Sequence, residues 1–242
     1  MADRSSLRIL VACEFSGTVR NAFLAEGYDA WSCDLLPAED GSNRHIRGDA
    51  RDLLDNGWDL LFVAHPPCTR LCNSGVRWLD EPPTNAPEAA TDEERSAWPM
   101  LGREARLAIM WRLLDEGAAL FSAFWNAPIE RIAIENPVMH RHAKGRIVDF
   151  RPPAQTVQPW WFGEPFFKAT GLYLRNLPPL IATNRLTPPS RGTAEHKAWS
   201  RVHRMPPGPN RAKERSRFFA GIAEAMAAQW GGHAFSQIRR AA

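Results

Sequence analysis

Short apolar runs recur along the chain, and each ends on polar residues. Three are clear: Leu7–Ala12, Asp59–Ala64 and Arg131–Ile134. The segment after the first run, residues 17–26, has apolar side chains at helical spacing and ends at Gly27. Short apolar runs separated by helices are typical of parallel strands buried on both faces. The sequence therefore predicts an α/β fold with a mostly parallel sheet flanked by helices.

Weaker patterns extend this prediction to the rest of the chain. Strands are expected at residues 29–33, 155–158 and 171–174, a short helix up to residue 54, a long helix at 101–124 and a C-terminal helix within 218–231. Residues 76–100 are rich in Pro, Ala, Glu and Asp, so we expect a mobile loop or insertion there. All of these elements are assigned to a single domain, residues 1–242.

Composition narrows the class of protein. Of the 242 residues, 44% are hydrophobic and 24% are charged, which is ordinary globular usage. The net charge of +3 is small, so a nucleic-acid surface requires local clustering of cations. Four cysteines are too few for a secreted disulfide scaffold, and no apolar run reaches the roughly 18 residues of a membrane helix. With no leader visible after Met1, we expect a cytoplasmic protein.

Polar residues follow the first two expected strands. The turn from Glu14 to Gly17 leads into a helix whose N-terminus can offer backbone N–H groups to an anionic or polar ligand. A plain strand-to-helix turn is the alternative. Asp34 ends the second strand, where nucleotide-binding α/β folds hold ribose hydroxyls. A solvated helix cap is the alternative for this acid.

The sequence His-Pro-Pro-Cys at His65–Cys68 follows the apolar strand at 59–64. Two prolines stiffen the loop and present Cys68 at the carboxyl end of the strand, as a nucleophile requires. A buried structural cysteine is the common alternative. A zinc site that combines Cys68 and Cys72 with a histidine, His65 or His140, has weak support because no second Cys or His pair accompanies the Cys-x3-Cys spacing.

Glu135 and Asn136 end the next apolar strand, at 131–134. A cysteine and a glutamate at neighbouring strand ends provide the two groups that activate a pyrimidine. The thiolate adds to C6 of the ring, and the carboxyl group engages N3. A helix-starting turn is the alternative for Glu135 and Asn136.

These motifs occur in a characteristic order. Phe15-Ser16-Gly17, Asp34, Asp49, Pro66-Pro67-Cys68 and Glu135-Asn136 together resemble the DNA cytosine-5 methyltransferase family, most closely its short bacteriophage members without a large target-recognition domain. The resemblance covers residues 7–140 and implies a Rossmann-like methyltransferase fold that uses S-adenosylmethionine. The family pattern assigns cofactor binding to Phe15, Ser16, Gly17, Asp34, Asp49 and Pro66.

By the same resemblance, Cys68 and Glu135 are catalytic and Asn136 contacts the substrate base. The implied reaction is methyl transfer to C5 of cytosine in DNA through a covalent adduct between Cys68 and C6. Residues 151–217 would then form a reduced substrate-recognition segment. The chain departs from the family in Pro137, where Val is usual, and in lacking the Gln-x-Arg-x-Arg run.

Cations that could hold DNA cluster late in the chain. Residues 201–217 carry Arg204 and Arg211 around a proline-rich turn, which suits phosphate contacts. A solvated charged loop is the alternative. Arg70 is a further candidate for DNA contact. The Trp160-Trp161 pair can stack on an unpaired base, although core packing is the more frequent use of such rings.

Other functions stay open at this point. A C5-pyrimidine transferase with a modified S-adenosylmethionine donor or a nucleotide substrate is the main alternative. An amino-methyltransferase is disfavoured because residues 65–68 lack the first amide or acid and the last aromatic residue of Asp/Asn-Pro-Pro-Tyr. A DNA-binding remnant of the fold is the non-enzymatic alternative. We expect no metal, no membrane and no obligate protein partner.

Overall fold

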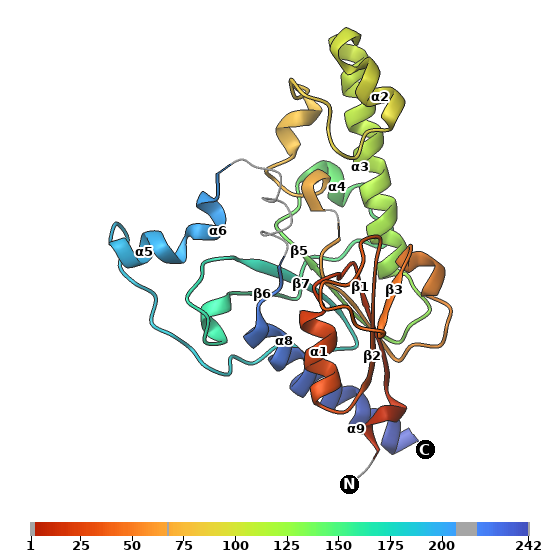
Figure 1. Cartoon of the computed structure of the whole chain (residues 1–242), viewed down its shortest axis with the longest axis vertical. Coiled ribbons are helices and arrows are strands. Elements are labelled where there is room, and N and C mark those ends of the chain that lie inside the picture. The colour runs from red at the N-terminus through yellow and green to blue at the C-terminus, as the bar shows by residue number, and fades with distance from the viewer. Residues whose placement is uncertain (1–2, 67, 207–216, 242) are drawn as a thin grey trace. The chain divides into compact units, whose positions relative to one another are not determined.

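The computed structural model describes residues 3–66, 68–206 and 217–241, and these group into two compact units (Figure 1). The first unit takes in the described parts of Met1–Pro66, Ala127–Glu135 and Pro152–Ala242. The second takes in those of Pro67–Asn126 and Asn136–Arg151. Each unit is described below by itself.

A seven-stranded sheet organises the first unit, in the order β3-β2-β1-β4-β5-β7-β6. The strands are β1 (Arg8–Ala12), β2 (Asp29–Asp34), β3 (His45–Arg47), β4 (Leu60–Val63), β5 (Arg131–Asn136), β6 (Gln155–Val157) and β7 (Thr170–Arg175). β1 pairs in parallel with β2 and β4, β2 with β3, and β4 with β5, whereas β6 and β7 are antiparallel. The predicted α/β fold with a mostly parallel sheet is confirmed.

The described helices range from single turns to one long helix. They are α1 (Thr18–Ala25), α2 (Asp92–Ala97), α3 (Arg103–Trp125), α4 (Arg141–Lys144), α5 (Ala194–Trp199), α6 (Arg201–Arg204), α8 (Ala220–Met226) and α9 (Gly232–Ala241). Single 3₁₀ turns occur at Arg4–Ser6, Ala50–Leu53, Cys68–Arg70, Val76–Leu79, Trp98–Met100 and Pro159–Trp161.

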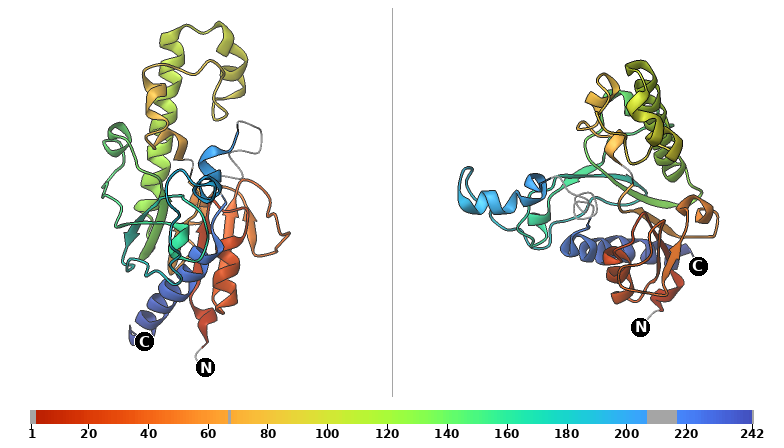
Figure 2. Two further views of the ribbon diagram at one scale, coloured as in Figure 1. Left: turned by 90° about the vertical axis from the view of Figure 1, so that its left-hand side faces the viewer. Right: turned by 45° about the horizontal axis from the view of Figure 1, so that its top comes forward.

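One face of the sheet packs against α1, α8 and α9, which lie side by side in Figures 1 and 2. Alternate residues of the strands supply this core. Ile9 pairs with Leu60 and Val11 with Phe62, and all four side chains are fully buried in it. The helices contribute residues such as Trp230. The side chains on this face of the parallel strands, which are every second residue, thus pack against the C-terminal helices and α1. The burial of these apolar side chains stabilises the contact.

The C-terminal helix continues further than the predicted 218–231. A π-helical turn at Ala227–Gly231 joins α8 to α9, so the chain stays helical to Ala241. The glycines at this junction, Gly231 and Gly232, do not end the helix. Instead, Gly231 lets the ring of Tyr28 approach closely, because an added Cβ would overlap that ring.

Residues 76–100, predicted as a mobile loop or insertion, contain α2 and two 3₁₀ turns. Thr91 and Glu94 form a capping box at the start of α2. Trp98 is buried, its indole N–H donates to the carbonyls of Pro83 and Thr84, and Arg106 of α3 lies over its ring. The segment therefore packs against α3 within the second unit and contains regular secondary structure.

Glycine at position 17 is required by two separate constraints, which gives a stability test. Gly17 has a φ of 74°, and an added Cβ would overlap the buried guanidinium of Arg20. Gly41 has a similar φ of 64° but open space around it. We expect Gly41→Ala to lower the free energy of unfolding by about 1–2 kcal/mol, and Gly17→Ala by about 3 kcal/mol or more, because steric overlap adds to backbone strain.

Urea denaturation of the two variants measures this difference. Equal losses would show that the Arg20 side chain yields freely and that only the backbone conformation matters.

Candidate active site

The carboxyl ends of β1 to β5 meet at one edge of the sheet, where ligands bind in doubly wound folds. The register pairs Ala12 with Cys33 and with Val63, and Val63 with Ile134. The residues that follow these positions therefore gather at the same edge. They include Glu14, Asp34, Asp49, His65 and Glu135.

Glu14 occupies the helix N-terminus that we expected to be open to a ligand. Its two carboxylate oxygens accept the N–H groups of Val19, at 2.6 Å, and Arg20, at 3.1 Å. Burial raises the pKa of Glu14 to about 7, and these two N–H donors act in the opposite direction. The expectation of free N–H groups on α1 is thus corrected, because the chain supplies its own carboxylate there.

The remaining members of the predicted cofactor loop differ in accessibility. Phe15 is buried, with 7% of its surface exposed, so little of its ring faces solvent. Ser16 is half-buried, and its hydroxyl lies 3.2 Å from that of Thr18. Gly17 forms the N-cap of α1 in the left-handed conformation that only glycine adopts readily.

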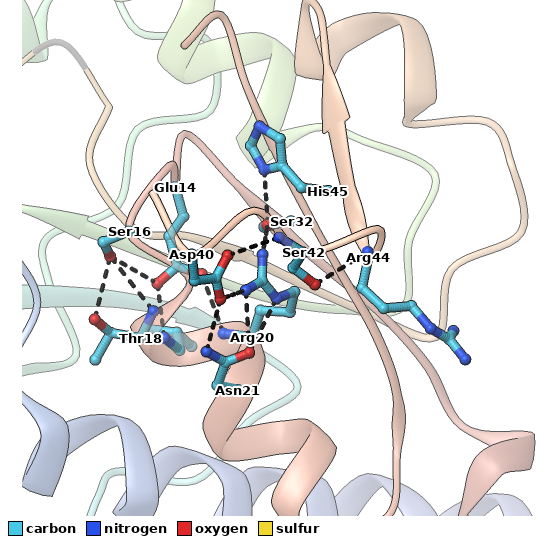
Figure 3. A network of polar contacts seen from close by, with 11 residues as sticks. Glu14, Ser16, Thr18, Arg20, Asn21, Ser32, Asp40, Ser42, Arg44 and His45 are labelled. Carbon is cyan, nitrogen blue, oxygen red and sulfur yellow. Dashed lines mark hydrogen bonds and ion pairs between the residues drawn. The ribbon is translucent and has the colours of Figure 1, made fainter. Parts of the chain in front are cut away.

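A buried arginine ties this loop to its neighbours (Figure 3). Arg20 is fully buried, and its guanidinium donates to Ser32 Oγ at 2.8 Å and pairs with the carboxylate of Asp40. Ser32 Oγ lies 2.9 Å from His45 Nδ1, which extends the network to β3. Sequence reasoning missed Arg20, since nothing in the pattern of α1 separates a buried arginine from a solvated one.

Asp34 ends β2 beside two exposed apolar side chains. Its carboxylate accepts the N–H of Leu36 at 2.9 Å, and burial raises its pKa above the ordinary value. The carbonyl of Leu35 accepts from Arg47 Nε and that of Leu36 lies 2.9 Å from His45 Nε2. The side chains of Leu35 and Leu36 are 70% and 49% exposed. A carboxylate with remaining acceptor capacity thus stands next to an apolar surface.

Asp49 lies near the same edge but is already paired. It caps the 3₁₀ turn that follows, and its carboxylate binds the guanidinium of Arg51, which lowers the pKa of Asp49. Cys13, at the end of β1, has a left-handed φ of 56°. Burial raises the pKa of its thiol, with the charges of Asp34 and Asp49 adding to the effect. These three strand ends therefore influence one another electrostatically.

His65 follows β4 and is a site residue whose role the sequence did not indicate. Its ring lies 5.7 Å from that of Phe218, and its Nε2 is buried with no hydrogen-bond partner among the described residues. Burial, together with the charge of Lys168, lowers the pKa of His65 to about 3. The imidazole is therefore neutral, with one polar atom left to receive a ligand group or water. Pro66, the next residue, is buried.

Cys68 begins a 3₁₀ turn of the second unit and is the more accessible member of a cysteine pair. The N–H of Cys72 donates to the carbonyl of Cys68 at 3.0 Å. A hydrogen bond between their side chains, with a further contact to Ser74, holds the pKa of Cys72 well below its usual range. Cys72 is therefore the acceptor in this pair, and the Cys68 thiol is the donor.

Glu135 is buried at the end of β5, with 5% of its surface exposed. Burial raises the pKa of Tyr173 on β7 to about 12, and the charge of Glu135 contributes to this shift. The phenol thus lies within electrostatic reach of the carboxylate, although nothing in its strand pattern had indicated a role. Asn136 is fully buried, and its Oδ1 has no partner among the described residues.

No group of three His, Cys, Asp or Glu side chains in the described ranges is placed to hold a metal ion. His140, a possible zinc ligand, uses both ring nitrogens within the protein. Nε2 lies 2.7 Å from the carbonyl of Arg70, and Nδ1 accepts the N–H of Ala143. The geometry gives the zinc alternative no support.

The candidate DNA contacts fall in different places. Arg70 is half-buried in the second unit, where burial lowers its pKa. Arg204 is exposed at the end of the helical turn α6, whereas Arg211 and the proline-rich turn from residue 207 onward lie outside the described residues. Trp161 packs against the core, and Arg185 lies over its ring and that of Trp160. Arg185 therefore covers part of each ring.

No protein-family model matches the sequence, and no curated protein matches it either. None of the described helices is long and apolar enough to cross a membrane. The site's geometry and the sequence motifs therefore carry the functional argument.

The neutral state of His65 gives a pH test. Between about pH 3 and 6.5 the unfolded chain binds a proton at His65 and the folded chain does not, so folding becomes less favourable as the pH falls through this range. From pH 7 to pH 5 we expect the wild type to lose about 2 kcal/mol more unfolding free energy than His65→Gln, which cannot titrate.

Urea denaturation at the two pH values measures this loss, with His233→Gln on α9 as a control that also removes one histidine. The same pH dependence in the wild type and His65→Gln would mean that His65 is solvated and titrates normally in the folded protein.

Proposed function

We propose that the protein transfers a methyl group from S-adenosylmethionine to C5 of cytosine in DNA. The observation that carries this proposal is the set of residues at the carboxyl edge of one parallel sheet. Asp34 stands at the end of β2, His65 and Pro66 follow β4, and Glu135 is the penultimate residue of β5, while Cys68 comes two positions after Pro66 in the sequence. The mostly parallel sheet flanked by helices is also compatible with the Rossmann-like methyltransferase fold that the resemblance implies.

The residues around Asp34 fit a nucleoside-containing cofactor. Ribose hydroxyls need an acceptor, which the Asp34 carboxylate supplies, and an adenine ring needs an apolar face, which Leu35 and Leu36 supply. Asp49 would hold a polar ring edge only by giving up part of its pairing with Arg51. When bound, S-adenosylmethionine supplies an electrophilic methyl group on a positively charged sulfur.

The chain's own groups would perform the rest of the reaction. The Cys68 thiolate adds to C6 of cytosine, and the electron pair of the C5–C6 bond becomes available at C5. Glu135 stabilises the ring by a hydrogen bond at N3. After C5 has taken the methyl group, it loses its proton to a base. The C5–C6 double bond then re-forms and expels the Cys68 thiolate.

Cysteine accessibility favours Cys68 over Cys72 as nucleophile. Cys68 is half-buried, whereas Cys72 is 7% exposed and is already bonded to Ser74. The hydrogen bond between the two side chains lowers the pKa of Cys72, so Cys72 is the acceptor and Cys68 must lose its thiol proton to a base before it attacks. We assign Cys72 a supporting role.

A cofactor-binding test follows from the placement of Asp34. Asp34→Ala should weaken binding of S-adenosylhomocysteine about 5- to 150-fold, the loss of roughly 1–3 kcal/mol for hydrogen bonds to a charged group. Asp34→Asn keeps an oxygen for the N–H of Leu36, so it should weaken binding while it preserves the loop and the stability. Isothermal titration calorimetry measures affinity, and the exposed Asp55→Ala is the control. Wild-type affinity in Asp34→Ala would remove this residue from the cofactor site.

A covalent-trapping test follows from the proposed chemistry. In DNA that contains 5-fluorodeoxycytidine, C5 carries fluorine in place of the proton that must leave, so elimination stops and the Cys–C6 adduct accumulates. With S-adenosylmethionine present, intact-mass spectrometry should detect this adduct for the wild type and for Cys72→Ser, and not for Cys68→Ser.

The opposite pattern, an adduct with Cys68→Ser but not with Cys72→Ser, would move the nucleophile to Cys72. The absence of both the adduct and 5-methyldeoxycytidine from wild-type reactions would refute the proposed function.

A further inference from the structure

A pocket of about 640 Å³ lies in the first unit between residues 164–168, α5 and α6, and the start of α8. Its walls are held by specific contacts. The Glu164 carboxylate accepts the N–H of Gly221 at 2.7 Å, which joins the first wall to α8. The N–H of Phe167 donates to the carbonyl of Trp199, and the two rings lie 5.3 Å apart, which joins the same wall to α5.

Positive charge dominates the pocket lining. Among the described residues, five cations line it, Lys168, Lys197, Arg201, Arg204 and Arg217, against one carboxylate, that of Glu164. Arg217 is paired with Glu39. The other four form no salt bridge within the part of the chain that the structure describes. Four uncompensated cations around one pocket favour a ligand with phosphate charge.

Aromatic rings make up the other part of the lining. Phe166 and Phe219 lie 5.0 Å apart, Arg201 sits 4.0 Å above the Phe166 ring, and Lys168 Nζ lies 5.6 Å from the Phe219 ring. Two cations, Arg201 and Lys168, therefore lie over the two aromatic rings of the lining. Bases stack on such rings and on guanidinium planes, while the cations hold phosphate. Inorganic phosphate alone would not contact the rings through stacking, and an apolar ligand would leave the cations without a partner charge.

The pocket also adjoins the end of β4. Phe218, a lining residue, packs edge-on against Phe62 of β4 at 5.4 Å and lies 5.7 Å from His65. The buried Nε2 of His65, with no partner among the described residues, is a polar atom beside this wall. The pocket thus borders the strand end that leads to Cys68.

We propose that this pocket binds a nucleotide. Its phosphate would contact Arg201, Arg204, Lys168 and Lys197, and its base would stack on the rings of Phe166 and Phe219. The inference rests on the proposed function, and it specifies which residues hold the substrate nucleotide. The same chemistry can come from a nucleotide within a DNA strand or from a free nucleotide such as dCMP.

Fluorescence anisotropy with a short labelled single strand tests the pocket without cofactor, so its outcome does not depend on methyl transfer. Arg201→Gln/Arg204→Gln should weaken binding at least about 10-fold and reduce the slope of log K against log salt by about 0.7 per lost phosphate contact. Phe166→Leu should weaken binding about 5-fold or more with the salt slope unchanged, because stacking is lost and charge is kept.

The matched control is Arg239→Gln/Arg240→Gln, which removes the same charge from exposed positions of α9. Displacement of the labelled strand by dCMP identifies a free nucleotide as an occupant. Failure of dCMP to displace it, with the pocket variants still weakened, identifies a nucleotide within a strand. If the pocket variants bind the strand and dCMP as the control does, while thermal melting shows all of them folded, the inference is overturned. Methylation by the wild type would then still stand.

Discussion

The buried Arg20 guanidinium is the interaction on which the candidate site depends most. A charge removed from water is tolerated only when other groups satisfy it, and here Ser32, Asn21 and Asp40 do so. These partners come from β2, α1 and the loop after β2. One side chain therefore fixes the turn at Gly17 and the segment that follows Asp34. Removal of Asp40 would leave the cation buried without its counter-charge, which costs more than the pair contributes.

Strand positions were predictable because burial on both faces leaves a strong apolar signal. Leu7–Ala12 and Asp59–Ala64 became β1 and β4 within one or two residues. β3 was missed because its three residues, His45–Arg47, are polar at both ends and are only partly buried. The helical turns α5 and α6 were missed for a similar reason, because they lie in a charged segment with little apolar spacing.

In the candidate site, some features follow from the sequence alone and others do not. Position at a strand end follows from sequence alone, so Asp34 and Glu135 lie at the sheet edge where we expected them. Side-chain partners do not follow from sequence. The capture of the α1 N–H groups by Glu14 and the pairing of Asp49 with Arg51 depend on the local backbone conformation, and the charge of Glu135 near Tyr173 depends on tertiary packing. The net charge of +3 likewise gave no sign that Lys168, Lys197, Arg201 and Arg204 line one pocket.

The loop after β2 is held through its main chain. His45 and Arg47 contact the carbonyls of Leu36 and Leu35, and Asp34 accepts the N–H of Leu36, while both leucine side chains project into solvent. At Leu35 and Leu36, main-chain hydrogen bonds therefore determine the conformation of the loop, and the side chains determine its surface. Under the proposed function, substitution there would alter which ring system the loop accommodates, while the backbone hydrogen bonds keep the adjacent carboxylate in place. The ligand preference of the proposed site could then evolve without a matching loss of stability.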